Sequence, residues 1–290
     1  MQPCRACRSN KNRLLFTVGE SRVAECLDCR LVYLDVFHDF ASIQDMYADY
    51  DSGRDFYFDN VNAEVNENID SYLRRCRQFT ASSAEKLRLL DIGCGVGILL
   101  ARANREGFVC EGVEICDPLA KATEQKVRCT VHRAFLREAE LSDNSFDVVT
   151  MYDLIEHLPE PADEIHRAYQ LLRPGGILFI LTPNNDALLR RVAKWAYQVS
   201  LHQFKKPMRT LYYSHHLSYF NRDSLSRLLQ QIGFEIVHTE TRNQELSRLS
   251  LSKLERSAVR TLFLISERYP SAGGKVLVWA RKTTAGTNFC

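Results

Sequence analysis

A strand, a glycine-rich turn and a helix follow one another between residues 87 and 107, and this arrangement constrains the fold most. LRLLDIG (87–93) is an apolar run typical of a buried strand. The turn Gly93-Cys94-Gly95-Val96-Gly97 then leads into a helical pattern that ends at Gly107. Glycines permit such a turn and let a ligand approach the backbone, while the helix N-terminus offers N–H groups to an anion. The G-x-G-x-G spacing differs from the G-x-G-x-x-G of dinucleotide-binding proteins.

Strands and helices alternate along the chain after this turn. We expect further strands at 109–115, 131–134, 146–153, 176–183, 234–240 and 275–282, and further helices at 117–126, 162–172 and 222–233. This order predicts an α/β fold with a seven-stranded, mostly parallel sheet and helices on both faces.

Two segments interrupt this plan, at about 186–213 and 242–268, and each has apolar residues at helical spacing. The first carries six basic residues against one acidic residue, and the second six against three. Insertions at the carboxyl ends of strands commonly form lids over a site. Because a basic amphipathic lid and a membrane-surface helix share one pattern, the sequence leaves peripheral membrane contact open.

Four of the ten cysteines lie within the first 29 residues. Cys4 and Cys7 form one C-x2-C pair, Cys26 and Cys29 form another, and 18 residues separate the pairs. This spacing is typical of a four-thiolate zinc ribbon, whose zinc is structural because no coordination site stays open. Four free thiols in a small lobe are the alternative. The arginines Arg8 and Arg30 stand where such knuckles often carry a glycine. We therefore expect a ribbon over residues 1–40, an acidic helical linker over 41–85 and an α/β domain over 86–285.

Charge and hydropathy exclude some functions and partners. The formal net charge is only +2, and residues 41–70 next to the ribbon contain eight acidic residues and one basic residue. A nucleic-acid partner is therefore not favoured, because such binding usually needs a strongly basic domain. The sequence shows no transmembrane run and no apolar secretory signal at the N-terminus. We expect a cytoplasmic protein with reduced thiols.

Several motifs taken together resemble those of class I S-adenosylmethionine-dependent methyltransferases. LLDIGCGVG (89–97) is similar to their hhDhGCGxG motif, and Glu114 stands 23 residues after Asp91 as the acid after the second strand. The remaining matches are TMYDLIEHLPEP (150–161), LLRPGGILFILTPNN (171–185) and HLSYFNRDSLSRLLQQIGFEIV (216–237). The resemblance implies a Rossmann-like fold. The catalytic half is similar to ubiquinone-pathway O-methyltransferases, and the ribbon that precedes it is similar to the zinc lobe of nucleotide-sugar C-methyltransferases.

The resemblance implies a role for each matching residue. The residues implied to contact S-adenosylmethionine are Asp91, Gly93, Cys94, Gly95, Gly97, Glu114, Ile115 and Asp153. Among them Glu114 would hold the ribose, Ile115 would pack on adenine, and Asp153 would face the sulfonium end. The third strand departs from the pattern, because Ala134, Phe135 and Leu136 stand where many relatives carry an aspartate for the adenine amino group. Backbone groups and stacking would then have to hold the adenine.

Two histidines are the candidate catalytic residues. Methyl transfer needs a well-placed nucleophile, and a hydroxyl nucleophile also needs a base with a pKa near the working pH. His157 follows the fourth strand and can serve as that base, or it can simply cap the next helix. Glu156 could orient His157, or join Asp153 around a hard cation. His216 matches the family motif and is expected near the acceptor. Neighbouring residues that could close the pocket, or only pack, are Tyr50, Tyr57, Tyr212, Tyr213 and His215.

These observations favour O-methylation of a small-molecule, sugar or glycan hydroxyl, with an acceptor that carries negative charge as one option. C-methylation of a nucleotide sugar is the first alternative. An RNA methyltransferase that uses the ribbon to hold RNA is the second, and a cofactor-binding protein without activity is the third. The sequence does not identify the acceptor or the oligomeric state.

Overall fold

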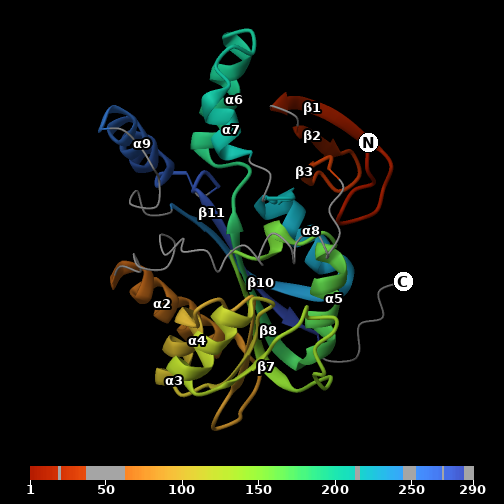
Figure 1. Cartoon of the computed structure of the whole chain (residues 1–290), viewed down its shortest axis with the longest axis vertical. Helices are drawn as coiled ribbons and strands as arrows, with labels where there is room; N and C mark the ends of the chain where they lie inside the picture. Colours follow the sequence, from red (N-terminus) through yellow and green to blue (C-terminus); the bar gives the residue numbers. More distant parts are fainter. Residues whose placement is uncertain (19–20, 37–62, 213–215, 244–252, 270, 284–290) are drawn as a thin grey trace.

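The structure is a computed structural model of the chain, and it describes residues 1–18, 21–36, 63–212, 216–243, 253–269 and 271–283 (Figure 1). Most of the acidic segment 41–70 therefore lies outside the described residues. Within the described ranges, no helix is both long enough and apolar enough to span a membrane. The predicted cytoplasmic location stays a prediction.

A seven-stranded sheet forms the centre of the molecule, in the order β10-β11-β8-β7-β4-β5-β6. Its strands are β4 (Arg88–Ile92), β5 (Val109–Val113), β6 (Thr130–His132), β7 (Phe146–Tyr152), β8 (Leu172–Pro183), β10 (Phe234–Arg242) and β11 (Lys275–Lys282). β11 runs antiparallel to β8 and β10, whereas the other neighbours in the sheet are parallel. The predicted α/β, Rossmann-like, mostly parallel sheet is confirmed.

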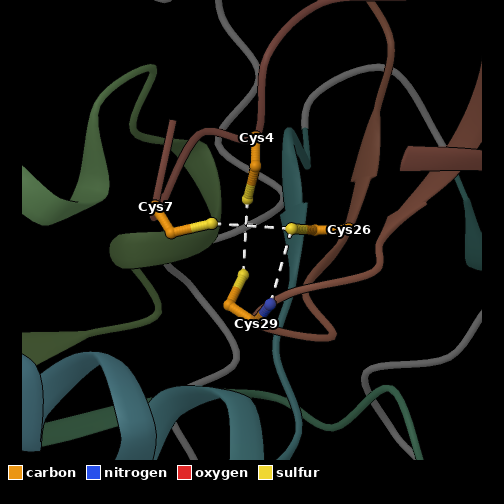
Figure 2. A group of neighbouring side chains, drawn as sticks. All are labelled: Cys4, Cys7, Cys26 and Cys29. Atoms are coloured by element: carbon orange, nitrogen blue, oxygen red, sulfur yellow. Dashed lines mark hydrogen bonds between the residues drawn. The ribbon is translucent and has the colours of Figure 1, made fainter. Parts of the chain in front are cut away.

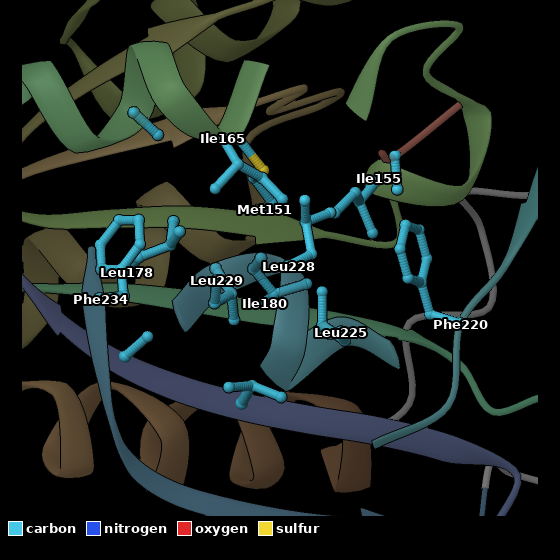
Figure 3. Packing of buried hydrophobic residues seen from close by; sticks show 14 of the residues in the cluster. Met151, Ile155, Ile165, Leu178, Ile180, Phe220, Leu225, Leu228, Leu229 and Phe234 are labelled. Atoms are coloured by element: carbon cyan, nitrogen blue, oxygen red, sulfur yellow. The ribbon is translucent and has the colours of Figure 1, made fainter. Parts of the chain in front are cut away.

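Side chains alternate between the two faces of this sheet, as the two-residue period of a strand requires. Leu178 and Ile180 of β8 pack with α5 (Pro161–Leu171) and α8 (Arg222–Ile232) on one face (Figure 3). Phe179 of β8 packs on the other face, which α2 (Ala63–Phe79), α3 (Ile98–Arg105) and α4 (Asp117–Val127) cover. Both faces of the central strands are buried, so most of their residues are apolar, and polar exceptions such as Asp91, Asp147 and Thr150 are buried as well.

Element boundaries differ from the sequence expectation at some points. β8 begins at Leu172 instead of residue 176, because Leu172 already pairs with Phe146 of β7 before a register shift. β5 ends at Val113, so Glu114 lies directly after the strand. β6 ends at His132 and is shorter than expected.

The ribbon forms a second sheet in the order β1-β2-β3-β9. Its strands are β1 (Asn12–Val18), β2 (Ser21–Cys26), β3 (Val32–Leu34) and β9 (Ser218–Tyr219). The first three strands come from the N-terminus, and β9 comes from the segment that follows the first insertion. A strand of the α/β part therefore completes the sheet of the ribbon.

The two interrupting segments contain helices. α6 (Leu188–Val199) and α7 (Lys206–Leu211) lie in the first, and α9 (Lys253–Ser266) lies in the second. Figure 1 shows α6 and α7 beside the ribbon, at the end of the molecule away from α3 and α4. Trp195, Leu201 and Phe204 are exposed on the first segment, among its basic residues.

Candidate functional site

The glycine turn, residues 93–97, connects β4 to α3 at the carboxyl end of the sheet. Gly93, Gly95 and Gly97 all have positive φ, at 71°, 52° and 71°. A Cβ on Gly97 would lie 2.7 Å from the Thr123 side chain of α4. Only glycine fits the turn here, because the backbone is left-handed and the neighbouring helix is in contact. The turn leaves the first N–H groups of α3 available to a ligand.

Glu114, directly after β5, holds the glycine turn through a hydrogen bond. Its carboxylate accepts a hydrogen bond from Gly95 N at 2.9 Å and another from Cys116 N at 2.9 Å. Burial raises the pKa of Glu114, and the two backbone donors oppose this shift. Each carboxylate oxygen has a second lone pair, so Glu114 can still accept from the hydroxyls of a ligand. Ile115 is half-buried beside it.

Asp91 lies beneath the turn, where it is almost fully buried. Its Oδ1 accepts a hydrogen bond from Thr150 Oγ1 at 2.6 Å. Burial raises the pKa of Asp91 to about 7, and the charge of Glu114 adds to the shift. Cys94 is buried too, and a Cβ on Gly112 of β5 would come within 2.7 Å of its sulfur. Cys94 therefore fills the space between the turn and β5, while Asp91 is bonded to Thr150 of the neighbouring strand β7.

The segment after β6 carries no acidic residue where the sequence resemblance implied an aspartate for the adenine amino group. Ala134 and Phe135 are half-buried there, and Leu136 is buried. The guanidinium of Arg137 lies 5.7 Å from the ring centroid of Phe135. The prediction that backbone groups and stacking hold the adenine stays a prediction.

Asp153 follows β7 in a left-handed conformation, with φ of 51°. Its carboxylate forms an ion pair with Nζ of Lys275, the first residue of β11. Lys275 was not among the residues predicted from the sequence. Its position as the first residue of the last predicted strand could have indicated it, because an antiparallel β11 places Lys275 opposite Pro183 at the same edge of the sheet. The charge of Asp153 is thus neutralised by this lysine.

Glu156, His157 and His216 come together at the same edge. Glu156 and His157 lie in the short 3-10 helix η3 (Ile155–His157), and His216 precedes β9. The two imidazole rings meet edge to face, with centroids 4.7 Å apart. One carboxylate oxygen and one nitrogen from each ring all lie within 4.8 Å of one another. The structure therefore brings together the two histidines that the sequence selected.

Glu156 is the most deeply buried member of this group, at 1% exposure. Its Oε2 accepts from Thr182 Oγ1 at 2.8 Å, and its Oε1 has no hydrogen-bond partner among the described residues. Burial raises the pKa of Glu156 to about 8; the negative charge of Asp153 adds to this, and Lys275 opposes it. Glu156 is thus mostly protonated near neutral pH, and in this neutral form its carboxyl group can donate a hydrogen bond. A carboxylate with two imidazoles is also a ligand set suited to a divalent cation. This set contains Glu156, His157 and His216, whereas the cation site considered from the sequence paired Glu156 with Asp153.

The four ribbon cysteines form a second cluster (Figure 2). The sulfurs of Cys4 and Cys29 lie 3.4 Å apart, and those of Cys7 and Cys26 lie 3.5 Å apart. These distances are too long for disulfides, whose sulfurs are about 2.05 Å apart. Zn–S bonds of about 2.3 Å give a tetrahedron with edges of about 3.8 Å. All four sulfurs lie within 4.8 Å of one another, so the set fits a tetrahedral zinc ion.

The two cysteine knuckles have the same backbone. Arg8 N donates to Cys4 O at 2.8 Å, and Arg30 N donates to Cys26 O at 3.0 Å. Arg8 and Arg30 both adopt positive φ, at 59° and 66°. The conformation that usually calls for glycine is therefore present, although arginine occupies both positions.

Other residues considered from sequence have ordinary structural roles or are not described. Tyr212 is buried, and its hydroxyl donates to Asn185 Oδ1 at 2.9 Å. Its ring lies 4.8 Å from the guanidinium of Arg190. Tyr212 therefore packs between the insertion and the ribbon sheet, where its ring also contacts Phe16 and Tyr219. The candidates that lie outside the described residues are Tyr50, Tyr57, Tyr213 and His215.

Comparison with known proteins fits this geometry. A family model described as a methyltransferase domain matches residues 62–239, more than half of the chain. The chain belongs to this methyltransferase family. The match confirms the family that the motifs predicted.

Curated relatives match over shorter regions. A ubiquinone biosynthesis O-methyltransferase of Saccharophagus degradans is 36% identical over 112 residues, which are 37% of this chain and 47% of that protein. One from Salmonella enteritidis is 30% identical over 142 residues, which are 43% of this chain and 58% of that protein. The match thus spans about half the length of these relatives.

Solved structures confirm the fold. Magnesium protoporphyrin IX methyltransferase from Synechocystis, with bound SAH, aligns with a TM-score of 0.57 at 16% identity, covering 84% of this chain and 100% of that one. A 1,6-didemethyltoxoflavin-N1-methyltransferase from Burkholderia thailandensis aligns with a TM-score of 0.55 at 16% identity, covering 89% and 98%. At this identity the likeness concerns the fold.

Proposed function

We propose that this protein transfers a methyl group from S-adenosylmethionine to a hydroxyl of a small molecule, sugar or glycan. One observation carries the proposal. The glycine turn, which Glu114 holds, follows β4, and His157 follows β7, a parallel neighbour of β4 that ends at the same edge of the sheet; His216 packs against His157 there. In a parallel α/β sheet, ligands bind at the carboxyl ends of the strands. A cofactor and an acceptor bound there would share one site.

The residues around the glycine turn suit this cofactor. The open backbone at residues 93–97 can accommodate the amino-acid part, and Glu114 can accept from the ribose hydroxyls. Half-buried Ile115 offers an apolar surface to the adenine. When bound, S-adenosylmethionine supplies an activated methyl carbon. The protein then has mainly to align the acceptor oxygen with that carbon and exclude water.

His157 is the proposed general base. An imidazole with a pKa near 6.5 can take the proton of a hydroxyl at neutral pH. His216 packs edge to face against it and would make a second polar contact with the acceptor. Glu156, buried near both rings, would stay protonated at neutral pH and would not compete for the proton.

A hydroxyl acceptor is favoured over the alternatives for two reasons. The curated relatives named above are O-methyltransferases of ubiquinone biosynthesis. A base formed by a histidine also suits an oxygen nucleophile. C-methylation of a nucleotide sugar is the runner-up, and the ribbon that precedes the domain is the feature that favours it. Binding to RNA is disfavoured by the net charge of +2.

We also propose that the ribbon cysteines bind one structural zinc ion. The support is the donor set of four thiols at distances that fit a tetrahedron. Metal analysis of the purified protein tests this directly. One zinc per chain is expected, and a metal-free ribbon that stays folded would refute it.

The experiment for the enzymatic function has two steps. Calorimetry with S-adenosylhomocysteine first tests the cofactor site, and Glu114→Ala serves as the variant that should lose affinity. Labelled S-adenosylmethionine is then offered with panels of phenols, glycans and nucleotide sugars. Transfer to a hydroxyl supports the proposal. Transfer only to carbon would favour the runner-up, and failure to bind S-adenosylhomocysteine would refute the proposal.

A further inference from the structure

The ribbon is hydrogen-bonded to the part of the site that carries the histidines. Strand β3 pairs antiparallel with β9, so that Val32 faces Tyr219 and Tyr33 faces Ser218. β9 begins two residues after His216. Sheet pairing fixes the register of both strands, and with it the position of the residues at their ends.

Leu217 joins the ribbon to Glu156 through its own peptide groups. Its carbonyl accepts from Leu34 N of β3 at 3.0 Å, and its N–H donates to Glu156 O at 2.7 Å. Leu217 directly follows His216, and Glu156 directly precedes His157. One residue thus connects the ribbon to the backbone next to both histidines.

Arg5 makes a second connection, from inside the first cysteine knuckle. Its guanidinium donates to Pro159 O at 3.2 Å and to Val36 O at 2.5 Å. Pro159 lies two residues after His157, in the loop that leaves η3. Hydrogen bonds from a charged donor are among the stronger ones in proteins. Arg5 therefore connects the Cys4–Cys7 turn to the loop directly after η3, the helix that carries the proposed base.

The first insertion also packs on the ribbon. Val23, Val32 and Leu34 of the ribbon form one buried apolar cluster with Tyr197 and other residues of α6 and α7. The Tyr197 hydroxyl donates to Thr17 O at 3.2 Å. The glycine turn has different supports: its backbone bonds to Val113 and to Glu114, and its Gly95 carbonyl accepts from Thr123.

We propose that the zinc ribbon is the positioning scaffold of the acceptor side of the site, which we define as residues 154–159 and 216–220. Arg5 is the positioning residue through which the first knuckle holds η3. Metal binding orders the knuckle, the knuckle holds Arg5 and β3, and these hold His157 and His216. The inference rests on the proposed function only where it calls this the acceptor side.

Hydrogen–deuterium exchange of the full-length protein tests the scaffold. Arg5→Ala keeps all four cysteines but removes the bonds to Pro159 and Val36. We expect about tenfold faster exchange in peptides covering the acceptor side, because local opening there becomes easier. Exchange at residues 93–97 and affinity for S-adenosylhomocysteine should stay unchanged. Arg5→Lys should restore part of the protection, since an ammonium group can still donate to Pro159 O.

Arg13→Ala is the matched control. Arg13 is also in the ribbon, but its ion pair is with Glu25 of the neighbouring strand β2. It should leave exchange of the acceptor side unchanged. Cys26→Ser tests the metal itself, and it should lose zinc and speed exchange in the same peptides. Unchanged exchange of the acceptor side in both Arg5→Ala and Cys26→Ser would overturn the inference. Failure of the unmodified protein to bind S-adenosylhomocysteine would overturn the proposed function instead.

Discussion

Glu156→Gln gives a quantitative test of the buried carboxyl behind the two histidines. The pKa of Glu156 is raised to about 8, first by burial and then by the charge of Asp153. In the unfolded chain a glutamate titrates near pH 4.3. Between these two values the folded protein holds a proton that the unfolded chain has released. The free energy of unfolding must therefore fall as the pH rises through this window.

The size of the effect follows from the shift. Each pH unit inside the window changes the free energy of unfolding by about 1.4 kcal/mol for one group. From about pH 5.5 to about pH 7.5 the contribution of Glu156 thus falls by about 3 kcal/mol. Glutamine cannot titrate, and its amide oxygen can still accept from Thr182. Relative to the unmodified protein, Glu156→Gln should therefore gain about 3 kcal/mol of stability across this interval.

Urea unfolding at the two pH values measures the difference. Asp91 and Glu164 are also buried, and their pKa values are raised to about 7 in both cases. Both groups are present in both proteins, so their contributions cancel in the comparison. Glu267→Gln, at an exposed position, is the control that should show no pH-dependent change. A difference between Glu156→Gln and the unmodified protein that varies by less than about 0.5 kcal/mol would refute the reasoning.

Three further predictions concern the turn, the base and the insertion. Gly97→Ala should weaken S-adenosylhomocysteine binding at least about tenfold in calorimetry, because the new Cβ would lie 2.7 Å from the Thr123 side chain. Gly107→Ala is the control: Gly107 has a φ of 80° and no atom within 4 Å of a new Cβ, so this variant should strain the backbone equally but leave S-adenosylhomocysteine binding unchanged. His157→Ala should lower kcat by about 10²–10⁴-fold and remove the acid-side loss of activity from the pH–rate profile, and an unchanged profile would contradict its role as the base. For the membrane contact that the sequence left open, Trp195→Ser should reduce co-flotation with anionic vesicles, and an unmodified protein that does not float would count against the contact.

The sequence predicted the parts of the molecule that local patterns specify. The strand, turn and helix around Gly93 depend on neighbours within a few residues, and so does the C-x2-C pair at Cys4. In both cases the spacing along the chain already determines the geometry. The second strand was expected at 109–115 and ends at Val113, so Glu114 lies just after the strand instead of inside it, an error of two residues at the strand end.

Contacts between distant segments were not predicted. The pairing of β3 with β9 joins residues near the N-terminus to residues near 218, and a two-residue strand carries almost no pattern of its own. The ion pair of Lys275 with Asp153 depends on the register of an antiparallel strand. The raised pKa of Glu156 depends on its burial, which a motif does not reveal. These features follow from tertiary packing.

The two tryptophans of the chain lie in opposite surroundings. Trp279 of β11 is fully buried against Tyr72 and Phe179, whereas Trp195 on α6 is 64% exposed. Intrinsic fluorescence should therefore have a blue-shifted component that soluble quenchers reach poorly, and a red-shifted component that they reach readily. The first reports on the interior of the sheet and the second on the insertion. One unlabelled sample can thus follow cofactor, acceptor and metal titrations at both places at once.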